Sequence, residues 1–138
     1  MKAVNIIAVY SADGERLLLC RRRKEPYAGR SNLVGGKLEP GEDGLAAAYR
    51  ELAEETGITA DDIALTHVMD YLYYMYDIRL EVYAGRLRRE VEVYGEENEL
   101  YWAGLTENFF DAAQFAGEGN LGHVLATIER CRERIFKP

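Results

Sequence analysis

The stretch that decides the fold is GKLEPGE at residues 36–42, followed after seven residues by RELAEETGI at residues 50–58. Three of its glutamates, Glu51, Glu54 and Glu55, have the spacing that places side chains on one face of a helix. Like charges at this spacing repel, and carboxylates near the end of a helix face the negative end of its dipole. Such a face favours a bound cation, and carboxylate oxygens suit hard cations such as Mg²⁺ or Mn²⁺.

A helix over residues 44–56 is predicted to carry this acidic face. Asp43 is suited to cap its first turn, and Gly57 is suited to end it. A second face, which we expect to be buried in the core, carries apolar side chains at helical spacing: Leu45, Ala48 and Leu52.

The residues around the helix supply further parts of a metal site. Gly35-Gly36 gives backbone that can approach closely and expose a carbonyl to the cation. Arg50 can form a bidentate pair with Glu42 and so hold the preceding loop to the helix. A solvated acidic face with ordinary ion pairs would explain each residue taken alone, but it does not explain the spacing of the whole set.

The other segments predict strands and one more helix. Residues 3–10 and 16–20 are expected to form a β-hairpin around the turn Asp13-Gly14. Further strands are predicted at residues 33–34, 66–94 and 100–103, and an amphipathic helix at residues 121–135 with Leu121, Val124, Leu125, Ile128, Cys131 and Ile135 on one face. This order predicts a single domain over residues 1–138 with an α/β (α+β) fold, a mixed sheet between helices.

Composition narrows the class of protein. A chain of 138 residues forms one core, and its net charge of −7 makes it a poor non-specific binder of nucleic acid but does not hinder binding of one small phosphorylated ligand. Cys20 and Cys131 lie far apart in sequence, so two reduced thiols are favoured over a disulfide. The N-terminus does not resemble a signal peptide and no apolar run has the length of a membrane span, so we expect a cytoplasmic protein.

The spacing of the deciding stretch resembles the Nudix box: Gly, five residues, Glu, seven residues, then Arg-Glu-aliphatic-any-Glu-Glu-any-Gly-aliphatic. Every specified position matches, namely Gly36, Glu42, Arg50, Glu51, Leu52, Glu54, Glu55, Gly57 and Ile58. At background residue usage, such a match arises by chance on the order of once in a million chains of this size. The resemblance implies the Nudix fold and an enzyme that hydrolyses a nucleoside diphosphate linked to another group, by attack of water on phosphorus.

The resemblance also implies roles for individual residues. The metal ligands would be Glu51, Glu54, Glu55 and the carbonyl of Gly35, with Mg²⁺ as the cofactor and Mn²⁺ able to replace it. Arg50 and Glu42 would orient the catalytic helix. A box glutamate, with Glu54 the first choice, or a glutamate of a later loop would be the general base.

The later glutamate is expected in the acidic loop before Trp102. Glu96 is the first choice by its distance from Trp102, and Glu97 is the second; Glu99 lies in the same loop. A solvated loop charge is the alternative explanation for each of them.

Three residues are candidates for substrate binding. Asn32 matches the position at which oxidised-purine nucleoside triphosphatases of this superfamily contact the base, although Leu33 replaces their usual Gly and the preceding Trp is missing. Asn120 lies in a segment that loosely resembles the base-reading segment of MutT-like enzymes, and capping of the final helix is the alternative. Arg22, in the run of arginines 21–23, is the candidate for phosphate, and an ordinary exposed arginine is the alternative.

Four tyrosines, Tyr71, Tyr73, Tyr74 and Tyr76, are expected to alternate across one strand. A sheet buried on both faces, or a homodimer contact, explains them more simply than base stacking does. His67 and His123 have no partners at ligand spacing and are interpreted as structural.

The preferred hypothesis is hydrolysis of a nucleoside triphosphate, ordinary or oxidised, to the monophosphate and pyrophosphate. Hydrolysis of ADP-ribose or of a nucleotide sugar is the alternative. A non-catalytic nucleotide-sensing module is less favoured because all metal glutamates are present, and RNA cap removal is less favoured because the chain is acidic and has no basic extension. The expected partner is a small-molecule nucleotide, with no membrane and no stable nucleic-acid binding.

Overall fold

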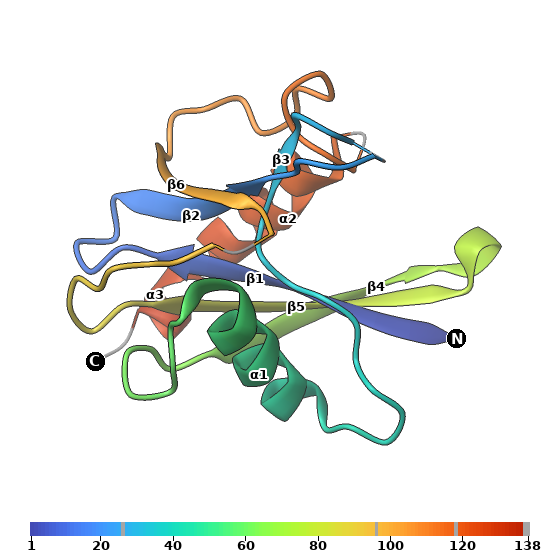
Figure 1. Cartoon of the computed structure of the whole chain (residues 1–138), viewed down its shortest axis with the longest axis horizontal. Helices are drawn as coiled ribbons and strands as arrows, with labels where there is room; N and C mark the ends of the chain where they lie inside the picture. Colours follow the sequence, from blue (N-terminus) through green and yellow to red (C-terminus); the bar gives the residue numbers. More distant parts are fainter. Residues whose placement is uncertain (26, 96, 118, 137–138) are drawn as a thin grey trace.

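The computed structural model describes residues 1–25, 27–95, 97–117 and 119–136. Its strands form one mixed sheet in the order β3-β2-β1-β5-β4, with β6 paired to β2 (Figure 1). The strands are β1 Lys2–Tyr10, β2 Arg16–Arg21, β3 Ser31–Asn32, β4 Thr66–Tyr73, β5 Ile78–Arg86 and β6 Glu99–Gly104. The helices are α1 Gly44–Thr56, the short 3₁₀ helix η1 Tyr74–Tyr76, α2 Asn120–Arg130 and α3 Arg132–Ile135.

Strand β1 pairs with different neighbours at its two ends. It runs parallel to β5 from the pair Lys2–Ile78 to the pair Tyr10–Arg86. Its antiparallel register with β2 is confined to Tyr10–Leu17, so the expected hairpin is present but its strands diverge. The segment 34–37 takes the place of β2 along the N-terminal half of β1, through bridges at Ile7–Val34 and Val4–Lys37. This pairing brings the glycines that precede α1 beside β1.

Helices cover both faces of the sheet. Ile7 and Val9 of β1 pack in one buried cluster that also holds Ala48 and Leu52 of α1. The intervening residues of β1 belong to a second cluster on the opposite face, built with α2 and α3: Ala8, Tyr10, Leu121, Val124, Leu125, Ile128 and Ile135. Figure 1 shows α1 on the near side of the sheet and α2 behind it. The predicted sandwich of a mixed sheet between helices is confirmed.

The prediction of one strand-like region over residues 66–94 is wrong in two places. β4 ends at Tyr73, and the following residues form η1, with Tyr74 77% and Tyr76 73% exposed. Asp77 has a left-handed backbone (φ 54°) and its N–H donates to the Tyr74 carbonyl, which closes a tight turn. The four tyrosines therefore do not alternate across one strand, and residues 87–94 lie outside the strands.

The predicted final helix is split at Cys131. This residue has φ −105° and ψ 8°, which interrupts the helical ladder between α2 and α3. The turn lets Arg132 donate to the Gly14 carbonyl at 2.6 Å and lie over the Phe136 ring, with 4.3 Å between the guanidinium carbon and the ring centroid. Contacts to the first hairpin thus override the helical periodicity of the sequence.

Leu45 is the one residue of the predicted buried face of α1 that is exposed, at 41%. The helix meets the sheet through Gly44, where an added Cβ would overlap the side chains of Glu81 and Tyr83. Because Gly44 is the contact in the first turn, Leu45 is rotated away from the sheet.

Both cysteines are free, with Cys20 buried and Cys131 half-buried, as expected for reduced thiols. In the described part of the chain, no helix combines the length and apolar character that a membrane crossing requires.

Candidate active site

Helix α1 begins and ends where its capping residues predict. The Asp43 side chain accepts a hydrogen bond from the Ala46 N–H at 3.1 Å. Gly57 has a left-handed backbone (φ 82°) and its N–H donates to the Ala53 carbonyl, which ends the helix. Burial of Ala48 and Leu52 against the sheet fixes the rotation of the helix and turns its acidic face outward.

Arg50 organises the acidic face. Its Nε and Nη2 donate to the two carboxylate oxygens of Glu42 at 2.7 and 2.8 Å, so the expected bidentate pair is present. Its Nη1 donates to Glu51 at 3.1 Å and to both oxygens of Glu54 at 3.3 Å. Nη2 also donates to the Lys37 carbonyl at 3.2 Å, which joins α1 to the preceding loop.

These contacts set the protonation of the glutamates. Hydrogen bonds from Arg50, and then from the Glu39 backbone, lower the pKa of Glu42 to about 2. Burial raises the pKa of Glu51 above its ordinary value. Burial, with the nearby charges of other glutamates, raises the pKa of Glu55 to about 7. Glu55 is therefore the carboxylate of the face that most favours an added positive charge.

The acidic face lines a cavity of about 280 Å³. Its walls are Glu51, Glu54, Glu55, Glu97, Asn98 and Leu100. This set of carboxylate and amide oxygens has the chemistry that hard divalent cations select. The described residues contain no group of three His, Cys, Asp or Glu side chains already gathered closely enough to hold a metal ion. Two of the glutamates, Glu51 and Glu54, are paired with Arg50.

Gly35 and Gly36 lie against this face. The Gly35 N–H donates to Glu55 Oε2 at 3.5 Å, which places the Gly35 backbone beside that carboxylate. An added Cβ on Gly36 would overlap the carboxylate of Glu51. Glycine is therefore required at Gly36 for the glutamate to lie where it does.

The structure separates the glutamates of the loop before Trp102. Glu96, the first choice from the sequence, lies outside the described residues. Glu97, the second choice, lines the acidic cavity. Glu99 lies on β6, pairs with Arg21 at 3.3 Å, and is not among the residues that line the acidic cavity.

A larger cavity of about 900 Å³ continues from the acidic one, and Glu55, Glu97 and Asn98 line both. All three residues proposed for substrate binding from the sequence, Arg22, Asn32 and Asn120, line this larger cavity. Of the three consecutive arginines, Arg22 is the one among its lining residues. The lining of the larger cavity thus combines carboxylates, cationic side chains and amides.

Asn120 does not cap the final helix. The N-cap of α2 is Gly119, and no side chain caps that end. The side chain of Asn120 instead lies beside Tyr73, whose pKa is raised by burial although Asn120 acts to lower it. The capping alternative for Asn120 is therefore wrong.

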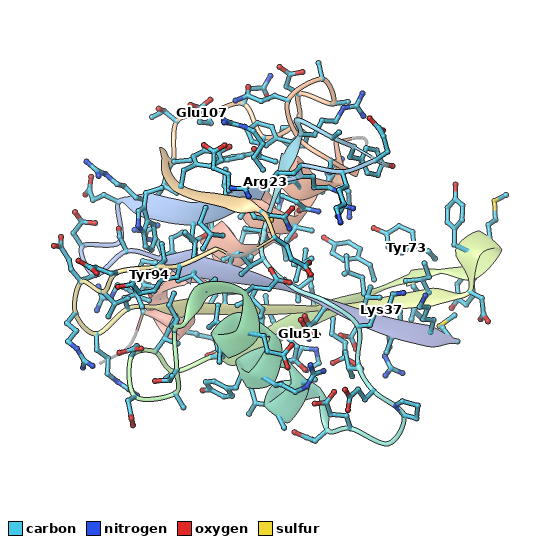
Figure 2. All side chains as sticks on the ribbon, viewed as in Figure 1. Arg23, Lys37, Glu51, Tyr73, Tyr94 and Glu107 are labelled. Atoms are coloured by element: carbon cyan, nitrogen blue, oxygen red, sulfur yellow. The ribbon has the colours of Figure 1, made fainter. Side chains whose placement is uncertain are left out.

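Sequence reasoning missed the aromatic side chains of the larger cavity. Tyr73 and Tyr76 come from the β4–β5 hairpin, and Tyr27 comes from the loop before β3. Figure 2 shows Tyr73 and Lys37 on the side of the molecule where the β4–β5 hairpin lies, and Glu51 on α1 near the middle of the molecule. The left-handed backbone of Tyr27 (φ 67°) is not a feature that sequence periodicity reveals.

Comparison with known proteins places these features in a family. The family model described as NUDIX domain matches residues 1–116. The CTP pyrophosphohydrolase of Escherichia coli (strain K12) is 41% identical over 61 residues, which cover 44% of this chain and 45% of that protein. The match thus spans less than half the length of that curated relative.

Two solved structures share the fold over nearly the whole chain. The Ap4A hydrolase of C. elegans, in a binary complex, is 20% identical with a TM-score of 0.76, covering 97% of this chain and 99% of that one. The dihydroneopterin triphosphate pyrophosphohydrolase of E. coli is 19% identical with a TM-score of 0.70, covering 93% and 95%.

Proposed function

The chain belongs to the NUDIX family, and from that premise we propose that it hydrolyses a nucleoside triphosphate to the nucleoside monophosphate and pyrophosphate. The family acts on nucleoside diphosphate derivatives, and the chain is a pyrophosphohydrolase of this kind. The observation that carries the finer proposal is the continuity of the acidic cavity with the larger cavity through Glu55, Glu97 and Asn98.

The side chains that line the larger cavity suit the two parts of such a substrate. Arg22 and Lys37 line it together with Glu55, so it offers cations for the phosphates as well as a metal-binding carboxylate. Asn32 and Asn120 line it as well, and their amides can read a base edge by hydrogen bonds. A volume of about 900 Å³ accommodates a nucleotide.

Members of the family need a divalent metal, and we propose Mg²⁺, which Mn²⁺ can replace. Glu51, Glu54, Glu55 and the Gly35 carbonyl would hold it, and this donor set of hard oxygens fits such an ion. When bound, the ion would neutralise charge on the diphosphate and lower the pKa of the attacking water.

The protein's own side chains would then accept the proton and orient the reacting groups. The oxygen of water bonds to phosphorus, the bond from that phosphorus to the bridging oxygen breaks, and a carboxylate takes the proton of the water. Glu54 is the first choice for this base; Glu97, at the junction of the two cavities, is the alternative. Arg50, held by Glu42, keeps α1 and its glutamates oriented.

The test is phosphate release with Mg²⁺, coupled to pyrophosphatase and alkaline phosphatase. The substrates are CTP and the other nucleoside triphosphates, 8-oxo-dGTP, ADP-ribose, nucleotide sugars and dinucleoside polyphosphates. We expect activity on the triphosphates and a loss of at least about 100-fold in kcat for Glu54→Gln.

The matched control is Glu107→Gln, which makes the same chemical change at a residue that Figure 2 shows far from Glu51. Activity on ADP-ribose or nucleotide sugars alone would favour the alternative substrate class. No activity on any of these compounds, with metal still bound, would favour a nucleotide-sensing module.

A further inference from the structure

Asn5 is a buried polar residue that the proposed mechanism does not use. Its side chain is 2% exposed and lies in β1 between apolar neighbours. Its Oδ1 accepts a hydrogen bond from the Gly36 N–H at 3.0 Å, and its Nδ2 has no partner among the described residues. Burying an amide with one unsatisfied donor costs free energy, so the presence of Asn5 is better explained by the hydrogen bond that its oxygen accepts from Gly36.

The partner of Asn5 lies in the segment 34–37, which runs antiparallel to β1. The Val34 and Gly36 carbonyls accept hydrogen bonds from the N–H groups of Ile7 and Asn5, both at 2.8 Å. In such a ladder alternate residues turn their backbone groups to opposite edges. Gly35 therefore turns its backbone groups away from β1, and its N–H points to Glu55 at 3.5 Å.

Asn5 takes the place of a backbone acceptor in this ladder. A regular antiparallel pair would direct the Gly36 N–H to the carbonyl of Asn5. That carbonyl instead lies against Gly35, where an added Cβ would overlap it. The side-chain oxygen of Asn5 satisfies the Gly36 N–H in its stead.

The peptide unit that Asn5 holds is the one that contains the Gly35 carbonyl. A trans peptide is planar, and its N–H and C=O point in opposite directions. By fixing the Gly36 N–H on the β1 side, Asn5 also fixes the Gly35 carbonyl on the side of Glu55. A hydrogen bond on the N–H also polarises the carbonyl of the same peptide.

The neighbours of Asn5 fix which end of the amide faces Gly36. A flipped amide would set the Nδ2 donor against the N–H donor of Gly36. Glu81, which pairs with Asn5 across the parallel strands, has both oxygens engaged, one by the Tyr83 hydroxyl at 2.8 Å and the other by Arg79 at 3.0 Å. The observed orientation is thus the one that satisfies Gly36.

We infer that Asn5 is a positioning residue of the metal site: its side-chain oxygen holds the Gly35–Gly36 peptide so that the Gly35 carbonyl is directed at the cation. The inference rests on the proposed function, because it assumes that the box glutamates bind a divalent ion. It adds to the site a residue from the first strand, far in sequence from the box.

The test is binding of Mn²⁺ alone, measured by calorimetry and by the electron paramagnetic resonance signal of free Mn²⁺. Asn5→Leu removes the acceptor, and we expect its Kd for Mn²⁺ to rise at least about 10-fold. Asn5→Asp keeps an acceptor of the same size, and we expect its Kd for Mn²⁺ to stay within about threefold of that of the unchanged protein. Ile7→Val, a small change on the same face of the same strand, is the control and should leave the Kd unchanged.

Nuclear magnetic resonance of the Gly36 amide separates positioning from general damage. We expect its proton to be protected from solvent exchange in the unchanged protein and in Asn5→Asp, and to lose protection in Asn5→Leu. Should Asn5→Leu fail to fold, fast exchange of the Gly36 amide in the unchanged protein would by itself overturn the inference.

The outcomes distinguish this inference from the proposed function. An unchanged protein that binds no Mn²⁺ refutes the metal site, and with it the proposed function. The role of Asn5 alone is refuted if the unchanged protein binds Mn²⁺ and the Kd of Asn5→Leu lies within twofold of that protein's Kd. The same conclusion follows if Asn5→Leu binds Mn²⁺ no more weakly than Ile7→Val does.

Discussion

Replacing Glu55 with glutamine should stabilise the protein when no divalent ion is present, and the gain should depend on pH. Burial and neighbouring glutamates raise the pKa of Glu55 from 4.5 to about 7. A carboxyl whose pKa is higher in the folded state than in the unfolded state favours folding while it is protonated. Its contribution is complete below about pH 4.5 and is lost as the pH rises through about 7.

The size of the effect follows from the same two pKa values. At about 1.4 kcal/mol for each pKa unit, the rise from 4.5 to about 7 corresponds to about 3 kcal/mol of unfolding free energy. Above pH 7 in EDTA, Glu55→Gln should therefore be more stable than the unchanged protein by up to about 3 kcal/mol. For a chain of this length that is a difference of about 10 °C in Tm.

The assay is thermal unfolding from pH 4.5 to 8.5 with EDTA or with excess Mg²⁺. In EDTA the two proteins should have similar Tm at pH 4.5 and should diverge as the pH rises. Mg²⁺ at about 100 times its Kd should stabilise the unchanged protein by about 3 kcal/mol at pH 8 and the variant by much less. Parallel pH profiles in EDTA would refute the burial argument, and an equal response of the two proteins to Mg²⁺ would refute the assignment of Glu55 as a ligand.

Two further variants test other parts of the site. Arg50→Lys replaces the planar guanidinium by an ammonium group and so loses the bidentate pair with Glu42. We expect kcat, measured by steady-state kinetics at saturating substrate, to fall by about 10- to 100-fold. An unchanged kcat would contradict the orienting role of the pair. Tyr73→Ala removes a ring from the larger cavity and should raise KM by about 10-fold with little change in kcat, whereas Tyr73→Phe should keep the KM; equal effects of both variants would show that the hydroxyl and not the ring matters.

The catalytic helix could be predicted from the sequence because its determinants are local. Asp43 and Gly57 mark its ends within the same short stretch, and the positions of Ala48 and Leu52 decide which side is buried. The pair of Arg50 with Glu42 is also local, since only seven residues separate the two. Leu45 departs from the pattern because its neighbour in the chain, Gly44, makes the contact with the sheet.

The larger cavity could be predicted only in part, because it depends on contacts between distant segments. Tyr73 faces the cavity because a tight turn at Asp77 folds the hairpin there, and the apolar run of the sequence conceals that turn. Asn120 could be an ordinary helix cap until the structure shows that Gly119 takes that position. The break at Cys131 has the same origin, since Arg132 contacts the first hairpin.

Strand β1 links the two halves of the site through the alternation of its side chains. Val4 and Ile6 line the larger cavity and pack with the cluster on the α2 face, while Asn5 between them hydrogen-bonds the backbone beside the acidic face of α1. Because β1 is paired with β5 along its whole length, these three residues form a stiff unit. A rigid strand fixes the position of this cavity wall relative to the glutamates, which is what a hydrolase needs to bring one phosphorus to the attacking water. A change that shifted the register of β1 by one residue would exchange its two faces and so remove both contacts at once.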